Sequence, residues 1–268
     1  MYKLGFIGAG VMAGAILDRI IDNIEHLDIN VEDIAIYDLS TERCDYFAAK
    51  GVNVAQSANE ICKQSEMVLL GVKPQFYADI LAKIEEFNCK IVLSIMAGIK
   101  ISTLKSAIKA EVGIVRMMPN TPCQVGKGVI AMCFDNICAQ DKKLIASLMG
   151  SCGSTLEISD NQFDAVTSVS GSGPAYVYMF AEGLIQGGIA GGLSYEQSRL
   201  LALKTIEGTA ILAANSPLST DILVEKVCSK GGTTIEAVNS FRNDGLVDIL
   251  KKGVEKCRAR SQELSDNL

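Results

Sequence analysis

The sequence predicts an α/β fold in which a doubly wound parallel sheet is followed by an all-α domain. Short apolar runs alternate with helix-like segments through the first part of the chain, as in a parallel sheet that helices cover on both faces. From Asp160 onward there is no convincing strand-like run, and helix start signals recur. We therefore expect a first domain over residues 1–160 and an all-helical second domain over residues 161–268.

Continuous apolar runs in the first domain predict its strands, because strands of a parallel sheet are buried on both faces. Helix-like segments lie between the runs, and Pro119 and Pro122 mark a sharp loop between the last two. The expected strands are 4–7, 34–37, 67–72, 91–95, 114–117 and 128–132, and the helix-like segments include 40–50 and 76–87.

Start signals and apolar segments predict the helices of the second domain. Pro174 suits the first turn of a helix, and residues 175–192 are apolar on nearly all sides, which predicts burial against other helices within a subunit or across a subunit interface. A capping pattern at 194–197 predicts the start of the next helix. The further expected helices are 195–214, a short one after 219–221, 235–241 and 245–263.

A glycine turn follows the first strand directly. Gly8 permits a tight turn, Gly10 has no side chain to keep a pyrophosphate away, and small Ala13 lets the following helix pack closely on the strand. Phosphate would then contact exposed N–H groups at the helix start. This arrangement predicts a dinucleotide-binding domain of Rossmann type, and the alternative is a glycine-rich turn that binds nothing.

Charge and hydropathy exclude two classes of partner. The net charge of −6 and the isoelectric point near 5.0 argue against a nucleic-acid surface, which needs clustered Lys and Arg. The longest uncharged stretch, 165–181, is too polar and broken to span a bilayer. Residues 1–7 lack the basic and apolar regions of a signal peptide, so we expect no signal peptide before the first strand. We expect a small-molecule substrate, no nucleic acid, no membrane and a cytoplasmic location.

The nine cysteines include no C-x-x-C pair, and they are interpreted as buried thiols in a reducing compartment. The only histidine, His26, stands apart from every motif, so no metal site is predicted. Because no motif contains a histidine, a Ser-His-Asp or Cys-His mechanism would lack its general base. A nicotinamide enzyme needs less from the protein, because its cofactor supplies the hydride.

Three loops could form such a site. Gly71–Pro74 follows a strand end, where Lys73 could contact a phosphate or carboxylate or else be an ordinary exposed lysine. Met96–Gly98 follows another strand end and would let a nicotinamide or ribose approach the backbone, although ordinary turn chemistry would look the same. Gly231–Thr234 offers N–H groups and hydroxyls for a carboxylate, or is simply a capped helix start.

Together these residues resemble the pyrroline-5-carboxylate reductase family, which catalyses the last step of proline biosynthesis. The resemblance covers nearly the whole chain, and its second-half motifs are specific. The landmarks, in the family's order, are F-I-G-A-G-V-M at 6–12, V-K-P at 72–74, R-M-M-P-N-T-P at 116–122, S-G-S-G-P-A-Y at 170–176 and G-G-T-T-I-E-A-V at 231–238.

The resemblance implies a Rossmann domain and an all-helical domain that dimerises, with dimers assembling into rings. It also implies that Thr234 and Ser172 are catalytic, and that Gly232, Thr233 and Thr234 bind substrate. Thr234 would hydrogen-bond to the imine nitrogen. The implied cofactor-binding residues are Ile7, Gly8, Ala9, Gly10, Val11, Met12, Gly71, Val72, Lys73, Pro74, Met96, Ala97 and Gly98.

Two residues do not fit the family pattern simply. One differs from the family's usual residue, and the other bears on the choice between NADP and NAD. Lys230 stands where the family usually has Pro, which frees the loop and adds a positive charge near the carboxylate site. Asp38 would accept hydrogen bonds from an NAD ribose and repel the extra phosphate of NADP, whereas Ser40 and Arg43 favour NADP. The expected cofactor is NADPH, with NADH as the alternative.

Two other interpretations stay open at this point. One is a Rossmann-type hydroxy-acid dehydrogenase, for which Lys204 is the candidate helix lysine, although a lysine on an amphipathic helix is the commoner explanation. The other is a non-catalytic NAD(P)-binding sensor, against which the intact G-G-T-T-I segment argues.

Overall fold

The computed structural model describes residues 1–266 of the 268-residue chain. The chain forms two compact units, Met1–Ser172 together with the chain from Cys257 onward, and Gly173–Lys256. Compact units and functional domains need not share boundaries. The division into a cofactor domain over 1–160 and a helical substrate and dimerisation domain over 161–268 therefore stays a prediction.

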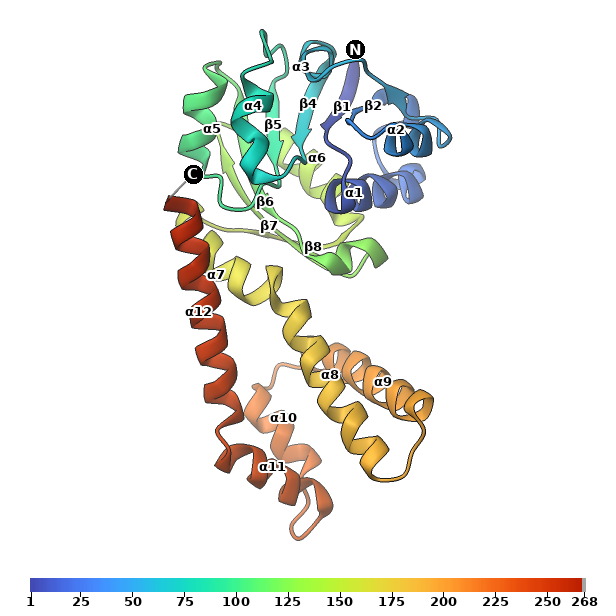
Figure 1. Cartoon of the computed structure of the whole chain (residues 1–268), viewed down its shortest axis with the longest axis vertical. Helices are drawn as coiled ribbons and strands as arrows, with labels where there is room; N and C mark the ends of the chain where they lie inside the picture. Colours follow the sequence, from blue (N-terminus) through green and yellow to red (C-terminus); the bar gives the residue numbers. More distant parts are fainter. Residues whose placement is uncertain (267–268) are drawn as a thin grey trace. The chain divides into compact units, whose positions relative to one another are not determined.

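An eight-stranded sheet forms the centre of the first unit, in the order β3-β2-β1-β4-β5-β6-β7-β8 (Figure 1). The order confirms the predicted doubly wound sheet, because the chain moves outward from β1 to β3 and then returns to β4 on the other side. The strands are β1 (Tyr2–Ile7), β2 (Ile34–Tyr37), β3 (Asn53–Val54), β4 (Ser65–Leu70), β5 (Ile91–Ser94), β6 (Gly113–Met118), β7 (Gly128–Asp135) and β8 (Gly153–Glu157).

The sheet departs from the sequence prediction in three places. The pair β6 and β7 is antiparallel, because the short connection from Met118 to Gly128 cannot make the crossover that parallel neighbours need. The sequence analysis missed β3, which has only two residues, and β8, whose residues are all at least partly exposed. Neither strand forms a continuous apolar run.

Helices flank the sheet in the first unit. Ser40 caps α2 by accepting a hydrogen bond from the Arg43 N–H, as the predicted helix over 40–50 requires. The helix predicted over 76–87 is shorter, since α4 ends at Leu81 and the N–H groups of Lys83 and Ile84 donate to carbonyls three residues back instead of four. The helices are α1 (Val11–Asp22), α2 (Thr41–Ala48), α3 (Ala58–Gln64), α4 (Tyr77–Leu81), α5 (Ile101–Ile108), α6 (Ala139–Gly150) and α7 (Phe163–Val166).

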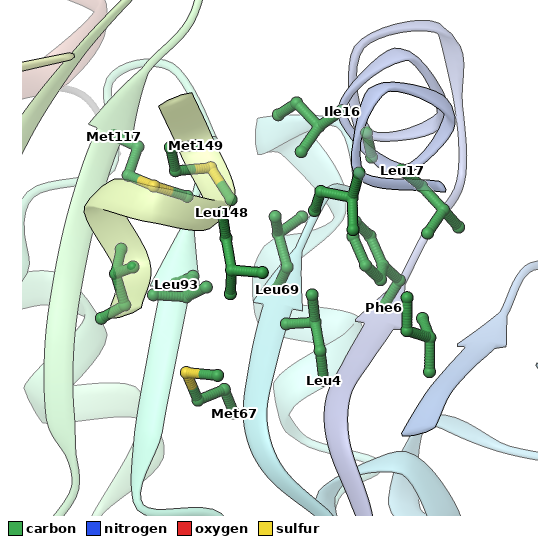
Figure 2. Packing of buried hydrophobic residues seen from close by; sticks show 14 of the residues in the cluster. Leu4, Phe6, Ile16, Leu17, Met67, Leu69, Leu93, Met117, Leu148 and Met149 are labelled. Carbon is green, nitrogen blue, oxygen red and sulfur yellow. The ribbon is translucent and has the colours of Figure 1, made fainter. Parts of the chain in front are cut away.

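Two apolar clusters cover the two faces of the sheet. Successive side chains of a strand point to opposite faces, so Leu4 and Phe6 of β1 belong to one cluster and Ile7 to the other. Figure 2 shows the first cluster, in which β1 side chains meet those of α1 and of the neighbouring strands. Its labelled members are Leu4, Phe6, Ile16, Leu17, Met67, Leu69, Leu93, Met117, Leu148 and Met149.

The carboxyl ends of β1 and β4 meet at the point where the strand order reverses. The Gly71 N–H donates to the Ile7 carbonyl at 2.9 Å, and Gly8 turns the chain with a φ of +87°. A Cβ on Gly71 would lie 2.5 Å from the Ala13 Cβ and 2.7 Å from the Gly8 carbonyl oxygen. Such a crevice is where open α/β sheets bind ligands.

The second unit is helical in all its regular structure, as predicted, over the residues that the structure describes. The Ser194 side chain and Gln197 form the predicted capping box at the start of α9. Close packing joins α8 to α9, since a Cβ on Gly188 would lie 3.0 Å from the Ser198 Cβ. The helices are α8 (Gly173–Ala190), α9 (Tyr195–Ala214), α10 (Thr220–Val227), α11 (Thr233–Asn243) and the first part of α12 (Leu246–Asp266).

Four of the nine cysteines are buried, and none forms a disulfide in the described chain. The prediction of burial is wrong for Cys138, which is exposed at the start of α6. A hydrogen bond with Cys89, together with burial, raises the pKa of the Cys62 thiol. A hydrogen bond with Cys123 raises the pKa of Cys152 in the same way.

Over residues 1–266, no helix has the length and apolar character needed to cross a bilayer.

We expect Gly71→Ala to destabilise the first unit by about 2 kcal/mol, because the new methyl group overlaps the backbone and Ala13. Gly10→Ala is the matched control, since a Cβ there meets no atom within 4 Å, and its cost stays below about 1 kcal/mol. Urea unfolding measures both values. Equal stability of the two variants would contradict the close packing at the crevice.

Candidate functional site

A cavity of about 410 Å³ opens at the crevice between β1 and β4. Three strand ends meet there, because parallel strands place their carboxyl ends on one edge of the sheet. The structure thus brings together Gly8, Asp38 and Lys73, which the sequence analysis assigned to one site from separate loops. The lining residues are Ile7, Gly8, Gly10, Tyr37, Asp38, Leu39, Gly71, Val72, Lys73, Phe76, Asp79, Ile80 and Lys83.

The glycine loop of this cavity fits the pyrophosphate of a dinucleotide. Gly10 is the N-cap of α1 and makes no side-chain cap, so the first N–H groups of the helix have no side-chain acceptor at that position. A Cβ on Gly10 would meet no protein atom within 4 Å, and Gly10 itself lines the cavity. Phosphate oxygens can therefore approach the backbone and the positive end of the helix dipole.

Asp38 holds the glycine loop instead of standing free in the cavity. One carboxylate oxygen accepts the Ala9 N–H at 2.6 Å, and the other accepts the Ser40 N–H at 2.8 Å. The Arg43 Nε donates to the Ala9 carbonyl at 2.7 Å, and the Arg43 guanidinium lies 5.0 Å from the Phe47 ring centre. Two charged side chains, Asp38 from the β2–α2 connection and Arg43 from the first turn of α2, thus hold one residue of the loop from both sides.

Other predicted cofactor residues contribute through the backbone or support the loop. The side chains of Ala9 and Met96 are buried, and Met12 packs against the first apolar cluster. Val11 is exposed at the start of α1. Ala9 and Met96 therefore offer a ligand their main chain, whereas the Val11 side chain is open to solvent.

A second cavity, of about 530 Å³, lies within the first unit. Pro74, Ala97 and Gly98 from the predicted cofactor loops form one side, and the predicted catalytic residue Ser172 is among the other lining residues. The sequence analysis missed the end of α12, which contributes Cys257, Arg260, Ser261 and Leu264. No local motif distinguishes these four residues, which are brought to the cavity by the tertiary fold.

A π-helix over Thr167–Gly171 places Ser172 in the second cavity. The Ser172 N–H donates to the Thr167 carbonyl at 2.8 Å, and π-helical turns often occur at functional sites. Upstream, the buried Arg116 forms a 2.8 Å ion pair with Asp160, and its guanidinium lies 4.2 Å from the Phe163 ring centre. This pair ties the segment that leads to Ser172 to strand β6.

The predicted substrate-binding residues Gly232, Thr233 and Thr234 start helix α11 in the second unit. Gly232 is the N-cap and makes no side-chain cap, and Thr234 is half-buried. N–H groups at this helix start have the geometry to bind a carboxylate. Lys230, just before the turn, is exposed.

Similarity to known proteins covers both halves of the chain. The profile described as pyrroline-5-carboxylate reductase dimerisation matches residues 160–264, and the one described as NADP oxidoreductase coenzyme F420-dependent matches residues 3–98. A pyrroline-5-carboxylate reductase of Arabidopsis thaliana is 34% identical over 99% of this chain and 96% of its own length. The chain belongs to the pyrroline-5-carboxylate reductase family.

Further members of the pyrroline-5-carboxylate reductase family match along their full length. The reductase of Synechocystis is 36% identical, with 98% of both chains covered. The crystal structure of a Plasmodium falciparum pyrroline carboxylate reductase with NADP bound superposes with a TM-score of 0.87 at 32% identity, covering 98% of each chain. The family membership confirms the resemblance inferred from the motifs.

We expect Asp38→Ala to weaken NADP⁺ and NAD⁺ binding together, each by about tenfold, because the Ala9 N–H loses its charged acceptor and the loop loses its position. Calorimetric titration of both dinucleotides measures this. Asp45→Ala on the exposed face of α2 is the control and leaves both affinities unchanged. A large gain for NADP⁺ alone would show instead that Asp38 acts as a direct cofactor selector.

Proposed function

We propose that this chain uses NADPH to reduce the C=N bond of 1-pyrroline-5-carboxylate and forms L-proline, the last step of proline biosynthesis. The full-length match to pyrroline-5-carboxylate reductases is the observation that carries the proposal. The cavity at the glycine loop and the adjoining loops supports it, because they fit a dinucleotide. NADPH is favoured since the similar Plasmodium structure has NADP bound.

When bound, the reduced nicotinamide would supply the hydride, and the residues of the chain would bind and orient the cofactor and the substrate. The backbone of 7–12 and the start of α1 hold the pyrophosphate, while Lys73 adds a positive charge. Pro74, Ala97 and Gly98, which line the second cavity, would border the nicotinamide end. Orientation of the two reactants is itself a large part of such catalysis.

Thr234 and Ser172 are the proposed catalytic residues. The Thr234 hydroxyl hydrogen-bonds to the imine nitrogen, and the N–H groups at the start of α11 hold the substrate carboxylate. Because an imine takes its proton from solvent, the reaction requires no histidine acid, which agrees with a chain whose only histidine is His26. Lys230 adds positive charge beside the carboxylate site.

Asp38 does not exclude NADPH in this proposal. Its two carboxylate oxygens already accept N–H groups of Ala9 and Ser40, and the Arg43 guanidinium lies on the other side of Ala9. These contacts offset the negative charge that would repel a ribose phosphate. Use of NADH as a second cofactor remains part of the proposal.

The direct test follows the absorbance of NADPH and, separately, NADH with the purified protein, with and without pyrroline-5-carboxylate. Oxidation that depends on substrate supports the reductase. Oxidation or reduction with 3-hydroxy acids instead would support the dehydrogenase, although its candidate Lys204 is exposed and paired with Glu207 at 2.6 Å. Cofactor binding with no turnover on either substrate would support a sensor.

Replacing Thr234 with Ala removes the hydrogen bond to the imine nitrogen. We expect kcat to fall about thirtyfold, equivalent to about 2 kcal/mol, while the dissociation constant of NADP⁺ stays nearly unchanged. Thr234→Ser keeps the hydroxyl and is the matched control, which retains most of the activity. An equal loss of turnover and cofactor affinity would reject the assigned role.

The chain is a homo-oligomer of the family's dimerising type, and we propose that dimers assemble further into a ring. Apolar side chains exposed on the second unit support the dimer, because such patches mark interfaces. Met179, Phe180, Phe241 and Leu250 are among them, and all four line an apolar groove of about 560 Å³.

The proposed compartment is the cytoplasm, on the evidence of the unpaired thiols of the described chain.

We expect Met179→Lys to shift the protein toward monomer, because it places a charge on the apolar face of α8. Sedimentation velocity measures the shift. Val125→Lys, an equally exposed apolar position in the first unit, is the control and leaves the assembly intact. An unchanged sedimentation coefficient for Met179→Lys would place the dimer interface elsewhere.

A further inference from the structure

Cys257 contacts the proposed catalytic residue Ser172 in the second cavity. Its thiol donates a hydrogen bond to the Ser172 hydroxyl oxygen over 3.3 Å, although the two residues are 85 positions apart in the sequence. Both side chains are half-buried, and both line the cavity beside Ala97 and Gly98. The contact joins α12 to the end of the π-helix within one compact unit.

Both partners of this hydrogen bond are fixed by other contacts. The backbone bond from Ser172 to the Thr167 carbonyl holds one side. On the other side, the Ser261 hydroxyl donates to an Asp164 carboxylate oxygen at 2.7 Å, and Ser265 donates to the same oxygen at 3.4 Å. The thiol and the hydroxyl therefore meet because two separately anchored segments converge.

A serine hydroxyl has one hydrogen, which rotates toward the best acceptor. When the Ser172 oxygen accepts the Cys257 S–H, its own hydrogen points away from the thiol and is free to meet an acceptor in the cavity. We propose that Cys257 is a positioning residue that directs the Ser172 hydroxyl hydrogen into the cavity, toward the bound substrate. This inference rests on the proposed reductase function and extends it to a residue outside its motifs.

The kinetic test compares Cys257→Ala with Cys257→Ser. We expect the Ala variant to raise KM for pyrroline-5-carboxylate about fivefold and to change kcat less than about twofold, because the affected contact forms equally in the ground and transition states. The Ser variant keeps a donor and restores KM to within about twofold of the native value. Urea midpoints of both variants show that the fold is intact.

A second measurement reads the position of the thiol without turnover. N-ethylmaleimide alkylates the intact protein, and peptide mass spectrometry follows Cys257 and exposed Cys138 separately. Because the cavity borders the expected nicotinamide position, saturating NADP⁺ slows the modification of Cys257 about fivefold or more and leaves Cys138 unaffected. Buried Cys62 and Cys152 stay unmodified and report that the protein remains folded.

The outcomes separate this inference from the function on which it rests. Absence of pyrroline-5-carboxylate reduction by the native protein would reject the proposed function. Normal reduction with an unchanged KM in Cys257→Ala, or an equally raised KM in Cys257→Ser, would reject only the positioning role. Binding of NADP⁺ without protection of Cys257 would likewise overturn it.

Discussion

The close approach of the β1 and β4 strand ends shapes the crevice at the centre of the sheet and the glycine loop beside it. Gly71 bonds to the Ile7 carbonyl, and a side chain at Gly71 would collide with Ala13 and with the Gly8 backbone. The approach directs α1 away from the sheet edge with its N–H groups facing a cavity. The proposed pyrophosphate contacts follow from that geometry.

Charged side chains secure the loops around this crevice, and they act mainly on backbone groups. Asp38 and Arg43 bind the N–H and the carbonyl of Ala9. Arg116 and Asp160 form an ion pair that joins the segment leading to Ser172 to strand β6. Such prior ordering suits a reaction in which the protein orients two reactants and the cofactor supplies the hydride.

Much of the fold was predictable from the sequence, because buried parallel strands and capped helices have strong local signals. The run 34–37 and the Ser194 capping box appear in the structure as predicted. Strand β8 was not predictable, since its residues are half-exposed and it depends on pairing with β7. The end of α4 at Leu81 was not predicted; beyond it the chain forms three-residue turns, and the Glu85 N–H donates to the Asn59 side chain.

In the candidate site, too, the loops were predictable from the sequence, whereas the side-chain contacts were not. Glycine loops such as 8–10 and 71–74 follow strand ends, and parallel topology brings strand ends together, so the first cavity could be inferred from sequence order. The orientation of Asp38 toward the Ala9 N–H could not, because it depends on side-chain rotamers. Cys257 has no sequence signal, since its role arises from the packing of a distant helix end.

Isotope transfer shows directly whether the hydride of the cofactor reaches the imine carbon. The purified protein is given pyrroline-5-carboxylate and NADPH that carries deuterium at both positions of nicotinamide C4, and the product is analysed by mass spectrometry and NMR. The account predicts proline with a single deuterium at C5, the former imine carbon. Proline without deuterium, or label in another product, would contradict direct hydride transfer to the imine in this fold.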